Sequence, residues 1–219
     1  MTGRPYALFL GCSVPVRAQN YEASVRRVAP LMGVALEDLA GSGCCGYPME
    51  PVSAGASLVM AARSLAIAAG KGMDVCALCS ACSGHLLEAA HALEDPASRE
   101  AANARLAKAG GPGYPGGVKV RHVAEILSGE GPTAALRAGL KRRLSGVRVA
   151  VHYGCHYFRP REIHAGHDDP EAPRTIEDLV SAAGATPVAY EGRLRCCGGG
   201  ILGIDEATAL AITRRKLDA

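Results

Sequence analysis

Residues 6–12 have the sequence YALFLGC, and residues 147–155 have the sequence VRVAVHYGC. Each is a short apolar run that ends in Gly-Cys, which predicts a buried strand with a cysteine at its C-terminal end. A second pattern is also duplicated, because Cys-Cys-Gly occurs at residues 44–46 and again at residues 196–198. The two copies are offset by about 150 residues, so the repeat predicts two related domains with two related sites.

The rest of the chain alternates between helical and strand patterns. The dipeptide Asp95-Pro96 has the form of a helix start, with Asp as the N-cap and Pro at the first helical position. Such alternation favours α/β units with parallel strand pairing. We expect strands over residues 6–11, 74–78, 147–153 and 186–190, and helices over residues 20–32, 54–69, 83–93, 96–108, 175–183 and 204–216.

A loop rich in Gly and Pro, GGPGYPGG at residues 110–117, is the best candidate for a domain boundary. We expect a first cysteine-rich domain over residues 1–110 and a connection with short helices over residues 111–146. A second cysteine-rich domain would then occupy residues 147–219. The predicted fold class is α/β, with two related domains, each a small, mostly parallel sheet flanked by helices.

The composition is that of a globular protein that folds without disulfide bonds. The chain has 219 residues, of which 48% are apolar, and its nine cysteines are clustered instead of spread evenly. The apolar runs are too short for a signal peptide or a membrane span, so we expect neither and place the protein in a reducing cytoplasm. In that compartment, clustered cysteines are more often metal ligands or catalytic thiols than disulfides.

The charge pattern does not indicate a nucleic-acid-binding protein. The net charge of +3 comes from 24 basic and 21 acidic residues, and only 4% of residues are aromatic, with no Trp. We expect the one compact basic group to form a solvated helix face, with an acidic partner surface or an anionic substrate as the alternatives. Its members are Arg137, Lys141, Arg142, Arg143 and Arg148.

Five cysteines of the first half are candidate metal ligands: Cys12, Cys44, Cys45, Cys79 and Cys82. Adjacent cysteines rarely share one tetrahedral zinc ion, whereas two adjacent thiolates can bind different irons of a cluster. Nearby glycines also permit backbone N–H groups to approach the sulfur atoms. We therefore favour an iron–sulfur site and keep zinc as the alternative. We expect Cys76 to pack within a strand, although it could replace a ligand.

The second half repeats only part of this pattern. Cys155 is followed, after 40 residues, by Cys196 and Cys197, and the remaining 22 residues contain no cysteine. By analogy with the first half, a closing CxxC is expected roughly a dozen residues beyond Ala219, so the second site is incomplete in this chain. His152 and His156 flank Cys155 and could serve as ligands or proton donors, or as hydrogen-bonded structural residues.

Several of these motifs together resemble the B subunit of heterodisulfide reductase, which has two cysteine-rich CCG domains. They are ALFLGCSVPVR at 7–17, GCCGYP at 43–48, the CxxC at 79–82, VAVHYGCHYFRPREI at 149–163, DDP at 168–170 and RCCGGG at 195–200. The resemblance implies a non-cubane [4Fe-4S] cluster held by Cys12, Cys44, Cys45, Cys79 and Cys82. Only Cys155, Cys196 and Cys197 match the second cluster, which leaves that cluster in question.

The same resemblance implies thiol–disulfide oxidoreduction on a small disulfide or thiol substrate. Electrons would come from a flavin-containing subunit through a small ferredoxin-like subunit, and the clusters would do the chemistry, with no other side chain assigned a catalytic role. Asp168-Asp169-Pro170 would shape the active-site entrance, or else form a turn or helix cap. Arg159 and Arg161 would meet an anionic substrate tail, or else face the surface or a partner.

Two other functions stay open at this point. One is an electron-transfer or scaffold subunit with one cluster and a second site that holds zinc or nothing. The other is a zinc-stabilised interaction module without redox function.

Overall fold

A four-stranded parallel sheet forms the centre of the N-terminal half, in a computed structural model that describes residues 4–164 and 168–218. Leu8 in the central strand β1 pairs with Asp38 on one side and with Cys76 on the other. Because the strands are parallel, the loops that follow them all open at one edge. The strand order is β2-β1-β3-β4, with β1 at Tyr6–Phe9, β2 at Leu36–Asp38, β3 at Val75–Ala77 and β4 at Val120–His122.

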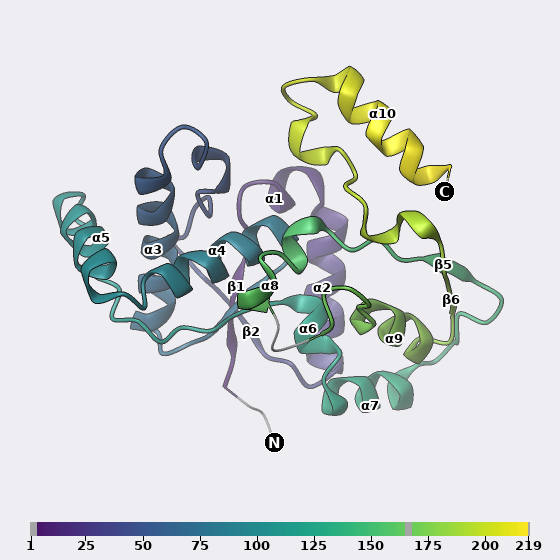
Figure 1. Cartoon of the computed structure of the whole chain (residues 1–219). Helices are drawn as coiled ribbons and strands as arrows, with labels where there is room; N and C mark the ends of the chain where they lie inside the picture. The colour runs from purple at the N-terminus through teal and green to yellow at the C-terminus, as the bar shows by residue number, and fades with distance from the viewer. Residues whose placement is uncertain (1–3, 165–167, 219) are drawn as a thin grey trace.

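Helices cover both faces of this sheet, as Figure 1 shows. Ala7 and Phe9 pack in one hydrophobic cluster with α3, α4 and α5, whereas Leu8 packs in another with α1, α2 and α6. Burial on both faces explains why the first strand is apolar throughout. The helices of the first cluster are α3 (Ala54–Gly70), α4 (Ser80–Ala92) and α5 (Pro96–Lys108), and those of the second are α1 (Val14–Arg17), α2 (Gln19–Leu31) and α6 (Val123–Leu127).

The C-terminal half contains a smaller parallel sheet of two strands, β5 (Arg148–Ala150) and β6 (Thr186–Val188). A small core of Val151, Tyr153, Tyr157 and Phe158 lies beside it, with side chains of α9 packed on it. The helices here are α7 (Glu130–Gly139), α8 (Arg161–His164), α9 (Thr175–Ala182) and α10 (Glu206–Leu217). Within the described residues, no helix is long and apolar enough to cross a membrane.

The two halves meet where the short 3₁₀ helix η2 (Cys155–Tyr157) packs on α4. Two glycines make this contact possible. A Cβ atom on Gly84 would collide with the backbone carbonyl of His156, and one on Gly154 would lie 2.5 Å from the hydroxyl of Ser80. The segment with Cys155 is therefore pressed against the helix that begins directly after Cys79.

The predicted α/β class, with two related domains and parallel pairing, is confirmed. Each predicted helix and strand is present, with ends shifted by a few residues; the largest change in a helix is that α4 begins at Ser80, so Cys82 lies inside it. Asp95 caps α5 as expected, accepting a hydrogen bond from Ser98 N at 2.8 Å. The strands β2 and β4 were not predicted, and β4 lies in the stretch that we interpret as a connection. The domain boundaries themselves stay a prediction.

The prediction of a basic helix face is wrong. Only Arg137 lies in a helix, whereas the other four basic residues follow in an exposed turn and at the start of β5. The helix ends early because Gly139 is its last residue and Leu140 is extended.

Both Cys-Cys-Gly segments have the same local structure. Gly46 and Gly198 adopt left-handed conformations, with φ of +102° and +82°. A Cβ atom on Gly46 would lie 2.5 Å from Ser57 O in α3, and one on Gly198 would lie 2.5 Å from Ala209 O in α10. Each glycine is followed by a 3₁₀ helix, η1 (Tyr47–Met49) or η4 (Gly199–Ile201), and then by a capped long helix.

This geometry predicts that Gly46→Ala strongly destabilises the protein, because the methyl group would face both an unfavourable φ and the Ser57 carbonyl. We expect the free energy of unfolding to fall by about 2–4 kcal/mol in chemical denaturation. Gly43→Ala is the matched control, since a Cβ atom there meets nothing within 4 Å and φ is not positive; its effect should stay below about 0.5 kcal/mol. Equal stability of the two variants would contradict the packing argument.

Candidate metal centre

Three segments bring five cysteines to the carboxyl edge of the larger sheet. Cys12 lies in the turn after β1, and Cys44 and Cys45 lie in the loop that precedes η1. Cys79 follows β3 as the N-cap of α4, and Cys82 lies in the first turn of that helix. The parallel order of the strands explains this convergence, because loops from their carboxyl ends share one edge.

Interactions between thiol groups join all five cysteines. Cys12 contacts Cys44, and Cys44 contacts Cys45. Cys82 then joins Cys45 to Cys79. The charge of Cys79 also acts on Cys45, so the five thiols form one connected group.

Burial changes steadily across this group. Cys45 and Cys82 are 2% and 5% exposed, Cys44 and Cys79 are half-buried, and Cys12 is exposed. One side of the site is therefore shielded from water, while the other side is open to a ligand or a partner.

Hydrogen bonds favour thiolates at two positions. The hydrogen bond from Cys82 lowers the pKa of Cys79 to about 6, and backbone N–H groups of Cys82 and Ala81 at the start of α4 also lower it. The pKa of Cys45 is lowered to about 7, chiefly by its hydrogen bond with Cys82. The same two bonds raise the pKa of Cys82, so it is the thiol of these three that keeps its proton, which it can donate to one of its two neighbours at a time. Thiolates are the form that binds metal.

Backbone N–H groups approach the sulfur atoms in the same way in both Cys-Cys-Gly segments. Gly46 N interacts with Cys44, and Tyr47 N interacts with Cys45. Burial raises the pKa of Cys44 despite the bond from Gly46, whereas the bond from Tyr47 helps to lower the pKa of Cys45. Gly198 N and Gly199 N lie 3.4 Å from the sulfur atoms of Cys196 and Cys197. N–H···S contacts of this kind tune the potential of iron–sulfur clusters.

Cys76 does not belong to this group. It is fully buried in β3, within the hydrophobic cluster on the α2 side of the sheet. Burial raises its pKa to about 12. The packing interpretation of Cys76 is confirmed.

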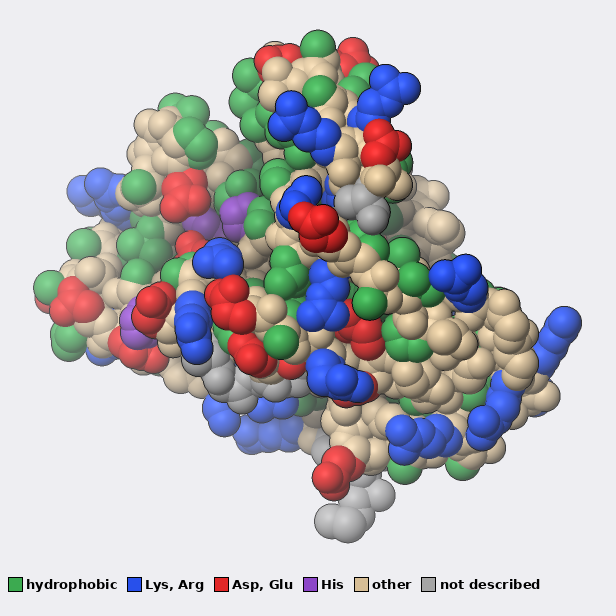
Figure 2. Space-filling model, turned by 45° about the vertical axis from the view of Figure 1, so that its right-hand side comes forward, with side chains coloured by type: hydrophobic (Ala, Val, Ile, Leu, Met, Phe, Trp, Pro, Cys, Tyr) green, Lys and Arg blue, Asp and Glu red, His purple; other side chains and the backbone are tan. Residues whose placement is uncertain are grey.

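The cysteines of the second half lie near Tyr47, the residue that follows the first Cys-Cys-Gly segment. Cys155 and Cys196 are exposed and Cys197 is half-buried. Burial raises the pKa of Tyr47, and the charges of Cys155 and Cys196 raise it further, so both lie near its hydroxyl. The ring of His156 packs edge-on against Tyr47 with centroids 4.6 Å apart. Figure 2 shows histidine side chains in the hollow between the α3 lobe and the α10 lobe.

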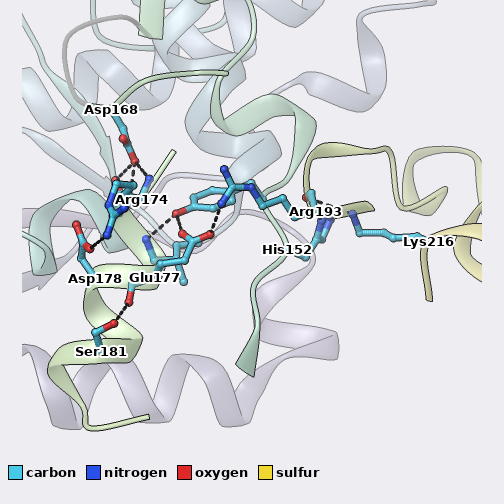
Figure 3. Close-up of polar contacts among 11 residues, drawn as sticks. His152, Asp168, Arg174, Glu177, Asp178, Ser181, Arg193 and Lys216 are labelled. Carbon is cyan, nitrogen blue, oxygen red and sulfur yellow. Dashed lines mark hydrogen bonds and ion pairs between the residues drawn. The ribbon is translucent and has the colours of Figure 1, made fainter. Parts of the chain in front are cut away.

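A polar network holds the loop that precedes Cys196, as Figure 3 shows. Lys216 is 7% exposed and donates to three carbonyl groups, among them Arg193 O at 3.2 Å and Arg195 O at 2.9 Å. Arg193 forms an ion pair with Glu177 at 2.9 Å, and Glu177 accepts a hydrogen bond from Tyr153. Burial lowers the pKa of Lys216, although the nearby Cys197 and Cys196 raise it.

The other candidates flanking the second group have structural contacts. His152 Nδ1 lies 3.3 Å from Arg193 O, which fits the hydrogen-bonded interpretation. Asp168 accepts hydrogen bonds from Arg174 N and Thr175 N at 2.8 Å at the start of α9, which agrees with a structural role in a turn or cap (Figure 3). Arg159 lies on the surface, 3.5 Å from Glu171.

Two residues near the cysteines, Tyr47 and Lys216, were not predicted from the sequence. Tyr47 follows the first Cys-Cys-Gly directly, so its position in that motif was the available signal. Lys216 stands 19 residues after Cys197, in an ordinary amphipathic pattern, and no sequence signal singles it out.

The donor set fits an iron–sulfur cluster. It offers five thiols, two of them with lowered pKa values, together with N–H groups directed at sulfur and a partly dry environment.

Comparisons with known proteins show which family the chain matches. The profile of the CCG family, described as "Cysteine-rich domain", matches residues 6–87 and 149–219. A protein of Archaeoglobus profundus, named as similar to the B subunit of heterodisulfide reductase, is 34% identical over 97% of this chain and 73% of its own length. The B subunit of the ferredoxin/F420H2-dependent CoB-CoM heterodisulfide reductase of Methanosarcina acetivorans is 32% identical over 96% of this chain and 71% of its own length.

Two further similarities concern other proteins. The 8-methylmenaquinol:fumarate reductase membrane anchor subunit of Wolinella succinogenes is 34% identical over 96% of this chain and 72% of its own length. A crystal structure of a hypothetical protein from Helicobacter pylori has the same fold, with a TM-score of 0.68 and 15% identity. The match covers 96% of this chain but 39% of that one.

The duplicated sequence, the shared local structure of its two cysteine pairs and these matches lead to one conclusion: the chain belongs to the CCG cysteine-rich domain family and resembles the B subunit of heterodisulfide reductase over almost its whole length.

Proposed function

We propose that this chain is a component of a heterodisulfide reductase complex, equivalent to its B subunit, and carries out thiol–disulfide oxidoreduction at an iron–sulfur site. The observation that supports this most strongly is the connected group of Cys12, Cys44, Cys45, Cys79 and Cys82 at one sheet edge. These five would hold a non-cubane [4Fe-4S] cluster. Cys155, Cys196 and Cys197 would supply part of a second site opposite it.

The cluster would supply electrons one at a time and an iron that binds a substrate sulfur atom. The protein's own residues would position the substrate and supply protons. Tyr47 and His156 pack against each other near cysteines of both groups, and a small disulfide would bind beside them. Reduction of a disulfide to two thiols consumes two electrons and two protons, and His156 would deliver a proton to a departing thiolate.

Electrons would reach the site from partner subunits. The exposure of Cys12, Cys155 and Cys196 leaves the site accessible from outside the chain. We propose a ferredoxin-like subunit as the direct donor and a flavin-containing subunit behind it, in a cytoplasmic complex that acts on a small disulfide or thiol.

A second candidate is an electron-transfer subunit whose substrate chemistry takes place on another chain. The similarity to a fumarate reductase membrane anchor subunit favours this function, because a related chain has that name in a different reductase. In that case the second site would hold zinc or no metal.

Metal analysis distinguishes these proposals. We expect about four irons and about four acid-labile sulfides per chain after anaerobic purification if one cluster is present, and about eight of each if both sites are filled. Cys82→Ala should remove the iron of the first site, because Cys82 links Cys45 to Cys79. Cys76→Ala, the matched control, changes a buried thiol outside the group and should keep the iron, counted per folded chain. Zinc alone in the wild type would overturn both redox proposals.

Spectroscopy tests the substrate class. Candidate small thiols and disulfides added to the partly oxidised, iron-loaded chain should change its EPR spectrum, because a substrate sulfur atom would bind at the cluster. A thioether analogue of the same shape is the control, since it has no S–S bond to cleave and no thiol to bind. Iron-loaded protein whose spectrum responds to none of the thiols or disulfides would support the electron-transfer function instead.

A further inference from the structure

Three side chains outside the cysteine group converge on one point. Glu50 follows η1 at the end of the Cys-Cys-Gly loop, whereas His85 and Glu88 lie on the same side of α4. One ligand atom from each lies within 4.8 Å of the other two. Over residues 4–164 and 168–218, this is the one group of three His, Cys, Asp or Glu side chains that meets that limit.

The hydrogen bonds of His85 decide which of its nitrogen atoms carries the proton. Ser57 donates its single hydroxyl proton to Gly46 O at 2.8 Å. The same hydroxyl lies 2.8 Å from His85 Nε2, so it must accept a hydrogen bond from that nitrogen. The neutral imidazole therefore has its proton on Nε2 and a free lone pair on Nδ1.

This lone pair is buried and has no hydrogen-bond partner. His85 is 6% exposed, and its Nδ1 atom is one of the few buried side-chain atoms without a hydrogen bond among the described residues. Its neighbour Glu50 Oε2 lies 3.8 Å away, too far for a direct hydrogen bond. A lone pair and two carboxylates that face one another repel unless a cation lies between them.

We propose that Glu50, His85 and Glu88 form a binding site for one divalent metal ion. One imidazole nitrogen and two carboxylates suit ions of borderline hardness such as Zn²⁺, Fe²⁺ or Mn²⁺, with water in the remaining positions. The bond from His85 to Ser57 is the outer-shell contact that orients a metal-binding histidine.

The position of the site suggests its role. A bound ion would connect the loop that contains Cys44 and Cys45 to the helix that begins after Cys79, because Glu50 belongs to the first segment and His85 to the second. It would thus fix the relative position of two segments whose cysteines we propose as cluster ligands. The site itself does not depend on the redox function.

Binding of Mn²⁺ to the iron-loaded full-length chain tests this proposal. Mn²⁺ prefers oxygen and nitrogen ligands to thiolates, so the cysteines compete poorly for it. Titration followed by the EPR signal of free Mn²⁺ should reveal one bound ion per chain, and pulsed EPR should detect the ¹⁴N nucleus of the bound imidazole. Glu50→Gln and Glu88→Gln should each weaken binding by about tenfold or more, and both leave the hydrogen bond between His85 and Ser57 in place.

Glu94→Gln is the matched control. Glu94 lies 3.3 Å from His91 just beyond the end of α4, but both side chains are well exposed, so this variant should bind Mn²⁺ like the wild type. The proposal is overturned if the wild type binds no Mn²⁺ at about 1 mM, if Glu50→Gln titrates like the control, or if no ¹⁴N coupling is seen. Because the Glu50 side chain is 47% exposed, its variant should fold and decides the outcome even if Glu88→Gln does not.

Discussion

The structure depends on a glycine that has no room for a side chain, at the end of each cysteine pair. Gly46 and Gly198 both have positive φ and both lie against a carbonyl of the helix that follows. This conformation turns the chain so that the N–H groups of the glycine and of the next residue point back at the two sulfur atoms. Two cysteine pairs far apart in the sequence are therefore presented in the same way, each anchored to its own helix. The repeated Cys-Cys-Gly sequence thus corresponds to the same backbone conformation and the same helix contact in both halves.

The second constraint is the parallel direction of the strands in the larger sheet. Parallel strands place the ends of β1 and β3 at one edge, and α4 begins there with Cys79 and Cys82. The same helix end that favours thiolate at Cys79 also contacts the 3₁₀ helix containing Cys155. The geometry of the first group and its position relative to the second are therefore set by a single element. The same helix also carries His85 and Glu88, which lie close to Glu50.

Much of this arrangement could be predicted from the sequence, for identifiable reasons. The strand that precedes Cys12 is apolar because it is buried on both faces, and Asp95-Pro96 is a strong local signal for a helix start. β2 and β4 were missed because LED and VRH are short and polar, and only pairing with neighbouring strands makes them extended. The convergence of Tyr47 with His156, and the burial of Lys216 under the loop before Cys196, depend on contacts between distant segments. The convergence of Glu50 with His85 and Glu88 does so as well. Such contacts leave no periodic pattern to detect.

The tight contact between α4 and η2 has a consequence for the history of the molecule. Gly84 lies in one half and Gly154 in the other. A methyl group on Gly84 would collide with a backbone carbonyl across the interface, and one on Gly154 would force the Ser80 hydroxyl to move. The halves repeat one pattern, yet their contact surfaces differ, so they are not interchangeable. A second half taken from a related protein would fit this first half only if it kept a glycine before its first cysteine. Descent should therefore have preserved the two glycines jointly, as a matched pair.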